Sequence, residues 1–295
     1  MSDDRTDRQM TEQAITVENI TFSYGALEAV RGISFQVASG EILGFLGPNG
    51  AGKSTTIKIL TGQLTPKSGR AQVLGVDILR DDPAMQAQIG VCFEEKNLYD
   101  SMSALENLRF YASLFGIKKL DAEALLRRVG LADRAKDRVR KYSKGMRQRL
   151  MMARALVNTP KVLFLDEPTD GLDPVSSQAI RNVIKEEAER GAAVLLTTHD
   201  MSEADELSDR VAFINEGKLY AIDTPEALKL AHGKRSVKVR LRDDGQVVEQ
   251  TVALDESGAG EQLAAAVRSP GLMTIHTEEA SLETIFILMT GRGLE

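Results

Sequence analysis

A glycine-rich segment, G-P-N-G-A-G-K-S at residues 47–54, carries the clearest chemical pattern of the chain. It fits G-x-x-x-x-G-K-[S/T] and joins an apolar run at 42–46, predicted as a strand, to a helix predicted over 52–61. Glycines allow several backbone N–H groups to point at phosphate oxygens, and the helix N-terminus adds partial positive charge. The alternative is a glycine-rich turn without function. We predict a phosphate-binding loop made of Gly47, Pro48, Asn49, Gly50, Ala51, Gly52, Lys53, Ser54 and Thr55.

Two adjacent carboxylates end a second apolar run, K-V-L-F-L at residues 161–165. In α/β proteins, ligands bind at the carboxyl ends of the strands, where Asp166 and Glu167 are expected to lie. With ATP as the ligand, Lys53 would neutralise the β- and γ-phosphates, whereas Ser54 and Asp166 would hold Mg²⁺. Glu167 would polarise the attacking water. The alternative interpretation is a pair of solvated surface acids.

The composition restricts the classes of partner. The chain has 295 residues with a net charge of −6 and no Lys/Arg-rich block, so no nucleic-acid partner is expected. Its single cysteine, Cys92, excludes an intramolecular disulfide, and residues 1–14 are polar and predicted to be a disordered leader. No apolar run reaches the ~20 residues that cross a bilayer. These features predict a cytoplasmic chain whose membrane role depends on a partner.

Alternating strand and helix patterns predict an α/β domain over residues 15–234. Strands are expected at 15–24, 32–37 and 69–75, within an antiparallel β subdomain, and a helical subdomain is expected at about 95–158. From residue 235 to 295, alternating apolar and charged positions predict a small α+β accessory domain with a hairpin around 243–245. Its role stays open among regulator binding, dimer stabilisation, bracing of a membrane subunit and a structural appendage.

A further segment, Y-S-K-G-M at residues 142–146, indicates which nucleotide-binding family is involved. It resembles the L-S-G-G-Q signature of ATP-binding cassette (ABC) ATPases. Ser143 and Gly145 match that pattern, whereas Tyr142, Lys144 and Met146 depart from it. The resemblance extends over about residues 15–231 and implies a P-loop ATPase fold of the ABC type, with ATP and Mg²⁺ as cofactors.

The resemblance implies roles for four further residues. Tyr24 would stack on adenine, Asp173 would communicate across a dimer, and His199 would be the switch histidine that contacts the γ-phosphate. Glu94 stands where the family has a glutamine that senses Mg²⁺, water and the membrane partner, so we predict a coupling residue with altered metal contact. The alternatives are a half-buried strand aromatic for Tyr24, a polar cap for His199 and a solvent-facing acid for Glu94.

The resemblance also implies two partners. In this family the signature faces away from the chain's own phosphate loop, so each ATP would lie between residues 47–54 of one cassette and Ser143, Lys144, Gly145 and Met146 of a second. That second cassette would be a copy of this chain or a different one. Residues 98–102 and 106–108 resemble a groove for a short cytoplasmic helix of an integral membrane subunit, although their apolar side chains could equally be core.

The resulting expectation is the ATP-hydrolysing subunit of an ABC transporter on the cytoplasmic side of the cell membrane. An exporter is favoured because the signature and the ending S-L-E-T-I-F at residues 281–286 resemble drug- and polysaccharide-export cassettes. The alternatives are an importer subunit, a soluble ABC ATPase of translation or DNA repair, and a small-molecule kinase of the P-loop class. The transported substrate cannot be inferred from this chain.

Overall fold

The computed structural model describes residues 12–93, 97–233, 236–243, 246–278 and 280–291. The chain forms two compact units that meet between Ile222 and Asp223. The sequence placed a boundary at 234/235. Helix α8 (Pro225–His232) is grouped with the second unit, because it packs against α10 (Leu282–Thr290) of that unit.

A six-stranded sheet forms the centre of the first unit, in the order β10-β9-β3-β8-β7-β6. Its neighbouring pairs from β9 to β6 are parallel. Successive residues of β7 alternate between two hydrophobic clusters, with Leu163 and Leu165 in one and Val162 and Phe164 in the other, so both faces of the sheet are buried. The strands are β3 (Ile42–Leu46), β6 (Ile89–Cys92), β7 (Val162–Asp166), β8 (Ala193–Thr198), β9 (Arg210–Asn215) and β10 (Lys218–Asp223).

An antiparallel sheet and helix α1 (Lys53–Leu60) share one hydrophobic cluster with one face of this central sheet. The antiparallel sheet has the order β2-β1-β4-β5. Its apolar side chains, such as Ile15, Val17 and Val37, pack with Ile57 and Phe45 in that cluster. The strands are β1 (Gln13–Tyr24), β2 (Leu27–Ala38), β4 (Ser68–Val73) and β5 (Val76–Asp77), and the short helix α2 (Pro83–Gln86) follows them.

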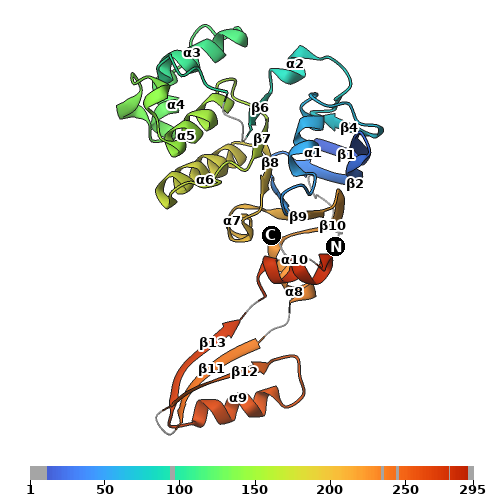
Figure 1. Cartoon of the computed structure of the whole chain (residues 1–295), viewed down its shortest axis with the longest axis vertical. Helices are drawn as coiled ribbons and strands as arrows, with labels where there is room; N and C mark the ends of the chain where they lie inside the picture. Colours follow the sequence, from blue (N-terminus) through green and yellow to red (C-terminus); the bar gives the residue numbers. More distant parts are fainter. Residues whose placement is uncertain (1–11, 94–96, 234–235, 244–245, 279, 292–295) are drawn as a thin grey trace, which may run out of the picture. The chain divides into compact units, whose positions relative to one another are not determined.

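Helices cover the other face of the central sheet, where their buried side chains share a cluster with those of β7 and β8. Figure 1 shows α3, α4 and α5 grouped together, with α6 beside them. Ser103 and Glu106 form the predicted capping box, and Ser143 caps α5, which therefore begins at Lys144. The elements are α3 (Ala104–Leu114), α4 (Ala122–Arg128), η1 (Ala132–Arg134), η2 (Val139–Lys141), α5 (Lys144–Ala155), α6 (Pro174–Glu189) and α7 (Met201–Leu207).

The second unit contains a three-stranded antiparallel sheet in the order β12-β11-β13, with α9 packed on one face. Val237 and Val239 of β11 pack with Ala266 of α9 in a small core. The predicted hairpin pairs Asp243 with Gln246. The elements are β11 (Ser236–Asp243), β12 (Gln246–Ala253), α9 (Ala259–Arg268) and β13 (Leu272–Glu278). The expected α/β architecture, with an antiparallel β subdomain, a helical segment and a small α+β unit, is confirmed.

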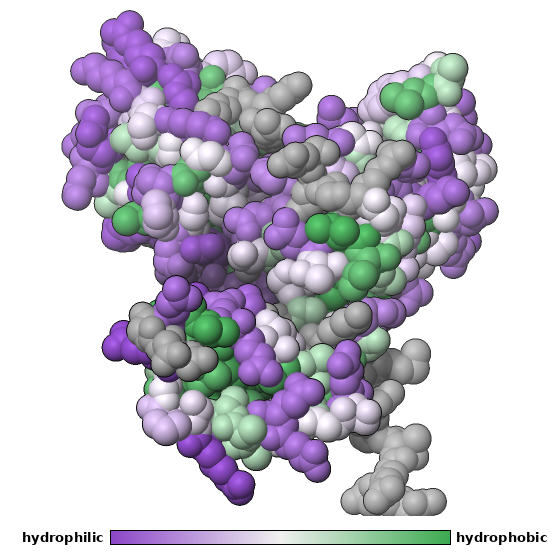
Figure 2. Space-filling view, turned by 60° about the horizontal axis from the view of Figure 1, so that its bottom comes forward, coloured by the Kyte–Doolittle hydropathy of each residue, from purple (hydrophilic) through white to green (hydrophobic). Residues whose placement is uncertain are grey.

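Most large apolar side chains lie inside these clusters, and Phe45, Phe164 and Phe213 are fully buried. Figure 2 shows a face on which hydrophilic side chains predominate and hydrophobic ones form separate patches. Within the described ranges, no helix has both the length and the apolar character required to cross a membrane.

Candidate ATP site

The loop at residues 47–54 connects β3 to α1, and its backbone requires glycine at three positions. Gly50 and Gly52 have φ angles of +80° and +108°, which side-chain-bearing residues rarely adopt. A Cβ at Gly52 would lie 2.5 Å from the backbone oxygen of Ala29, and one at Gly47 would overlap that of Ile214. No side chain caps α1, so N–H groups of its first turn remain available to an external anion.

The ammonium group of Lys53 lies over this loop, although the side chain is only 5 % exposed. Its Nζ donates to the carbonyl oxygen of Gly47 at 2.6 Å and lies 3.1 Å from Oε1 of Glu167. A buried lysine requires such acceptors or a compensating negative charge. A triphosphate in the loop would supply the same kind of charge-assisted contact.

Ser54 and Asp166 meet at the carboxyl end of β7. The Ser54 hydroxyl donates to Asp166 Oδ1 at 3.0 Å, and the Thr197 hydroxyl donates to the same oxygen at 2.6 Å. Mg²⁺ prefers oxygen ligands and commonly takes only one or two from the protein, with waters and phosphate oxygens completing the octahedron. The described residues hold no cluster of three or more His, Cys, Asp or Glu suited to a metal. The Ser54–Asp166 pair fits Mg²⁺ bound together with a nucleotide, because a hydroxyl and a carboxylate oxygen meet there.

Glu167 and His199 form the second polar contact of the site. Nδ1 of His199 lies 3.0 Å from Oε2 of Glu167, with the direction of the hydrogen bond set by the tautomer. Glu167 has a φ angle of +48°, and its N–H donates to the backbone oxygen of Thr197 at 3.1 Å. Backbone strain of this kind persists only where surrounding contacts enforce it, and it is common at functional sites.

The other oxygen of Glu167 is the free acceptor of the site. Oε1 is buried and has no hydrogen-bond partner among the described residues, because the 3.1 Å ion pair with Lys53 lacks hydrogen-bond alignment. A buried carboxylate oxygen without a donor is unfavourable. A water molecule beside it would satisfy that acceptor and would be polarised by it.

Tyr24 lies at the end of β1 with 48 % of its surface exposed. Its ring contacts Phe22 in an edge-to-face arrangement, with centroids 4.9 Å apart. Tyr24 pairs with Leu27 at the start of β2, the strand whose Ala29 touches the phosphate loop at Gly52. The exposed ring is therefore carried by a strand pair that borders the loop.

The signature segment lies at the start of α5. Ser143 is exposed and accepts a hydrogen bond from the N–H of Met146 at 3.2 Å. Gly145 is buried against Ser176, and a Cβ added at Gly145 would lie 2.9 Å from the Ser176 hydroxyl. Among the described residues, no hydrogen bond or ion pair joins the signature to residues 47–54. Lys144 instead forms an ion pair with Asp170, with Nζ 3.4 Å from Oδ2.

Asp173 caps α6 by accepting a hydrogen bond from the N–H of Ser176 at 3.0 Å. Hydrogen bonds from the Ser176 side chain and backbone lower the pKa of Asp173. The sequence reasoning assigned this residue only to communication across a dimer. Glu94 lies outside the described residues, so its coupling role stays a prediction; the described chain before it ends at Phe93, just after β6.

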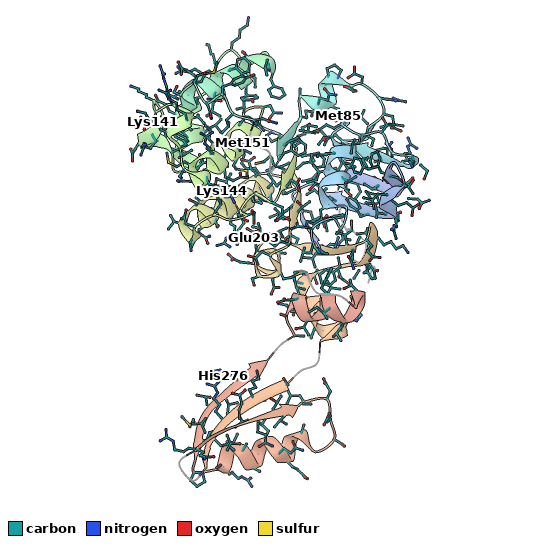
Figure 3. All side chains as sticks on the ribbon, in the orientation of Figure 1. Met85, Lys141, Lys144, Met151, Glu203 and His276 are labelled. Carbon is teal, nitrogen blue, oxygen red and sulfur yellow. The ribbon has the colours of Figure 1, made fainter. Side chains whose placement is uncertain are left out.

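Sequence reasoning missed the groups that surround Glu167 and His199. Oδ1 of Asp170 lies 3.9 Å from Nε2 of His199, on the side opposite Glu167. Glu203 of α7 is buried and binds the hydroxyls of Thr169 and Thr198. Figure 3 labels Lys144 and Glu203 on their helices. The spacing of four residues between His199 and Glu203 is the available sequence signal, and by itself it indicates only one helical turn.

Comparison with known proteins adds sequence relatives. Residues 30–170 match the model of the ABC transporter family. A fluoroquinolones export ATP-binding protein of Mycobacterium tuberculosis is 46 % identical over 286 residues, which cover 96 % of this chain and 95 % of that protein. The daunorubicin resistance ATP-binding protein DrrA3 of Streptomyces coeruleorubidus is 38 % identical over 253 residues, which cover 84 % of this chain and 80 % of that protein.

Solved structures show the same fold. The ATP-binding subunit of an ABC transporter superposes with a TM-score of 0.68 at 29 % identity, over 74 % of this chain and 92 % of that one. A cassette solved as a dimer in a post-hydrolysis state, bound to ADP and Pi, superposes with a TM-score of 0.65 at 25 % identity. The superposition covers 71 % of this chain and 98 % of that one. The chain therefore belongs to the ABC transporter family, as an ATPase subunit.

Proposed function

We propose that this ATPase hydrolyses ATP at the 47–54 loop, with Glu167 as the general base that activates the attacking water. The convergence of Lys53, Asp166, Glu167 and His199 at one edge of the central sheet is the observation that carries the proposal. Lys53 would bind the β- and γ-phosphates. Mg²⁺ held near Ser54 and Asp166 would neutralise phosphate charge in the transition state.

His199 would orient Glu167 through its Nδ1 and contact the γ-phosphate. The two groups already lie 3.0 Å apart, and His199 is 44 % exposed, so its ring can be reached by a nucleotide in the loop. The base needs an oxygen within hydrogen-bond reach of the water, and Oε1 of Glu167 offers an unused acceptor. Tyr24 would stack on the adenine, because its exposed ring borders the loop.

A second cassette would complete each ATP site. Ser143, Lys144, Gly145 and Met146 begin a 12-residue helix whose N-terminal end carries partial positive charge suited to a phosphate. In the described chain this end makes no polar contact with its own 47–54 loop, and Ser143 is exposed. The similar cassette solved as a dimer supports pairing of two cassettes. In a head-to-tail pair, Asp173 would lie near the opposite site.

A separate integral membrane subunit would receive the motion of this pair, with the ATPase on the cytoplasmic side of the cell membrane. A hollow of about 440 Å³ supports such docking, because Phe93, Asn97, Tyr111 and Phe115 line it. The groove predicted from the sequence lies partly in the core, since Asn107 and Leu108 are fully buried. Aromatic residues around a hollow are typical of sites that receive an apolar helix face.

Export is the direction we assign to the transporter. The relatives from Mycobacterium tuberculosis are named for fluoroquinolone export, and a relative from Paraburkholderia xenovorans is named for Nod factor export. The latter is 37 % identical over 304 residues, covering 97 % of this chain and all of that protein. Export is the feature that these names share, whereas their substrates differ.

The test is the Glu167→Gln variant, which keeps the size of the side chain and removes its charge. We expect ATP binding to persist, hydrolysis to fall at least about 100-fold, and an ATP-bound dimer to accumulate on size exclusion. Glu189→Gln, an exposed position at the end of α6, is the matched control and should hydrolyse ATP normally. Normal turnover by Glu167→Gln would show that the base is wrongly assigned. Purification of the native complex should recover an integral membrane protein.

A further inference from the structure

Glu203 is a buried carboxylate to which the mechanism above gives no role. The residue is 3 % exposed and lies in the first turn of α7, four positions after His199. No Lys, Arg or His of the described chain lies within ion-pair distance of its carboxylate; Arg181 acts on it from farther away, and Asp200 is the neighbouring acid. Burial without a direct cation raises the pKa of Glu203. A carboxylate that is buried without a direct cation needs hydrogen bonds to stabilise its charge.

One set of these hydrogen bonds joins Glu203 to Thr198 and Asp200, the residues on either side of His199. The N–H of Asp200 donates to the Thr198 hydroxyl at 3.0 Å, and that hydroxyl donates to Oε2 of Glu203 at 3.3 Å. The N–H of Glu203 donates in turn to Oδ1 of Asp200 at 3.0 Å. The residues on both sides of His199 are therefore fixed, whereas its ring stays free to face Glu167.

A second contact ties the same carboxylate to the segment that carries Glu167. The Thr169 hydroxyl lies 2.6 Å from Oε1 and 2.7 Å from Oε2 of Glu203, so its single hydrogen is shared between them. Thr169 follows Glu167 by two residues and precedes the loop that leads to Asp173. One side chain on α7 thus binds both the last residue of β8 and the segment that follows β7.

We propose that Glu203 is a positioning residue for ATP hydrolysis, which fixes His199 relative to Glu167 by binding Thr198 and Thr169 at the same time. This inference rests on the roles proposed above for His199 and Glu167. A carboxylate suits the task because it only accepts hydrogen bonds, so both hydroxyls are forced to donate. A neutral amide would offer one acceptor and two donors, and the hydroxyl orientations would no longer be unique.

The experiment compares isosteric threonine variants, which avoid removing the buried carboxylate itself. Thr198→Val and Thr169→Val each delete one donor, whereas Thr198→Ser and Thr169→Ser retain it. We expect each valine variant to lower kcat about tenfold or more, with the KM for ATP within about twofold, and each serine variant to recover most of the activity. Glu203→Gln should lower kcat in the same way.

A matched control separates positioning from general damage to the fold. Glu187 of α6 is another buried glutamate, 1 % exposed. Unlike Glu203, it forms ion pairs, with Arg128 and Arg190. Glu187→Gln should lower the melting temperature while kcat stays unchanged. A second measurement is the ring NMR signal of His199, which can be assigned because the chain has three histidines. We expect it to broaden or shift in Thr198→Val and to stay unchanged in Glu187→Gln.

Wild-type kcat in both valine variants, or a rise in KM without a fall in kcat, would overturn the proposal. An unchanged His199 ring signal in Thr198→Val would overturn it as well. These outcomes differ from failure of the proposed function, which would appear as normal hydrolysis by Glu167→Gln. Inactive Glu167→Gln together with fully active threonine variants would leave the catalytic base in place and remove only the positioning role of Glu203.

Discussion

Replacement of Gly52 by alanine is the sharpest test of why the phosphate loop has its shape. Gly52 has a φ angle of +108°, and the Cβ of alanine would lie 2.5 Å from the backbone oxygen of Ala29. The unfavourable φ costs on the order of 1–2 kcal/mol. Relief of the contact requires a shift of the backbone, because no side chain can rotate away, and such overpacking costs about 1–3 kcal/mol more.

Gly52→Ala is therefore expected to lower the free energy of unfolding by about 3 kcal/mol. For a unit of this size it corresponds to a melting temperature lower by roughly 6–12 °C. Gly62 is the matched control, since its φ is +75° but a Cβ there would meet nothing within 4 Å. Gly62→Ala should cost only the φ term, about 1 kcal/mol, or roughly 2–4 °C.

The assay is thermal unfolding of the nucleotide-free chain, followed by titration with a fluorescent ATP analogue. Gly52→Ala should also weaken nucleotide binding at least about tenfold, because displaced N–H groups no longer converge on the phosphates. Gly62→Ala should bind as tightly as the unmodified chain. Equal melting temperatures and equal affinities in the two variants would refute the argument from loop geometry.

Two further predictions concern the signature and Glu203. Ser143→Ala removes the cap of α5, so we expect about 1 kcal/mol of destabilisation and, in the Glu167→Gln background, weaker ATP-dependent dimerisation on size exclusion. Asp121→Ala removes the cap of α4 and should leave dimerisation intact; equal dimerisation in both variants would contradict a role in the second site. Burial raises the pKa of Glu203 above its ordinary value of 4.5, so the folded chain binds this proton more tightly than the unfolded chain. The melting temperature should therefore rise relative to that of Glu203→Gln as the pH falls from neutral toward 4.5, and a constant difference would contradict this.

The features that the sequence predicted correctly are those that depend on local sequence patterns. The loop at 47–54 lies between β3 and α1, Asp166 ends β7, and Ser103 begins α3 with its capping box. Each depends on residues close together in the chain, such as an apolar run, a turn-forming glycine or a cap. For the same reason the hairpin of the second unit was predictable from the alternating positions and the turn-forming residues at 243–245.

The features that the sequence did not reveal depend on contacts between distant segments. Glu203 becomes significant only because α7 carries it to Thr169, 34 residues earlier in the chain. Helix α8 lies before the expected boundary but packs against α10 near the end of the chain. Lys144 was expected to face a second cassette, and its contact with Asp170 spans 26 residues. Local pattern gives no information about such pairs.

The contact of Lys53 with Glu167 has a consequence for the timing of the reaction. One ammonium group lies 2.6 Å from the carbonyl oxygen of Gly47 and 3.1 Å from the Glu167 carboxylate. An arriving triphosphate competes for that cation, and with several negative charges it is the stronger competitor. In the proposed mechanism, the carboxylate would then become available to take a proton from water in the same event that delivers the substrate. On the role proposed for Glu167, the ion pair with Lys53 would balance the charge of the base until a nucleotide takes over that ammonium group.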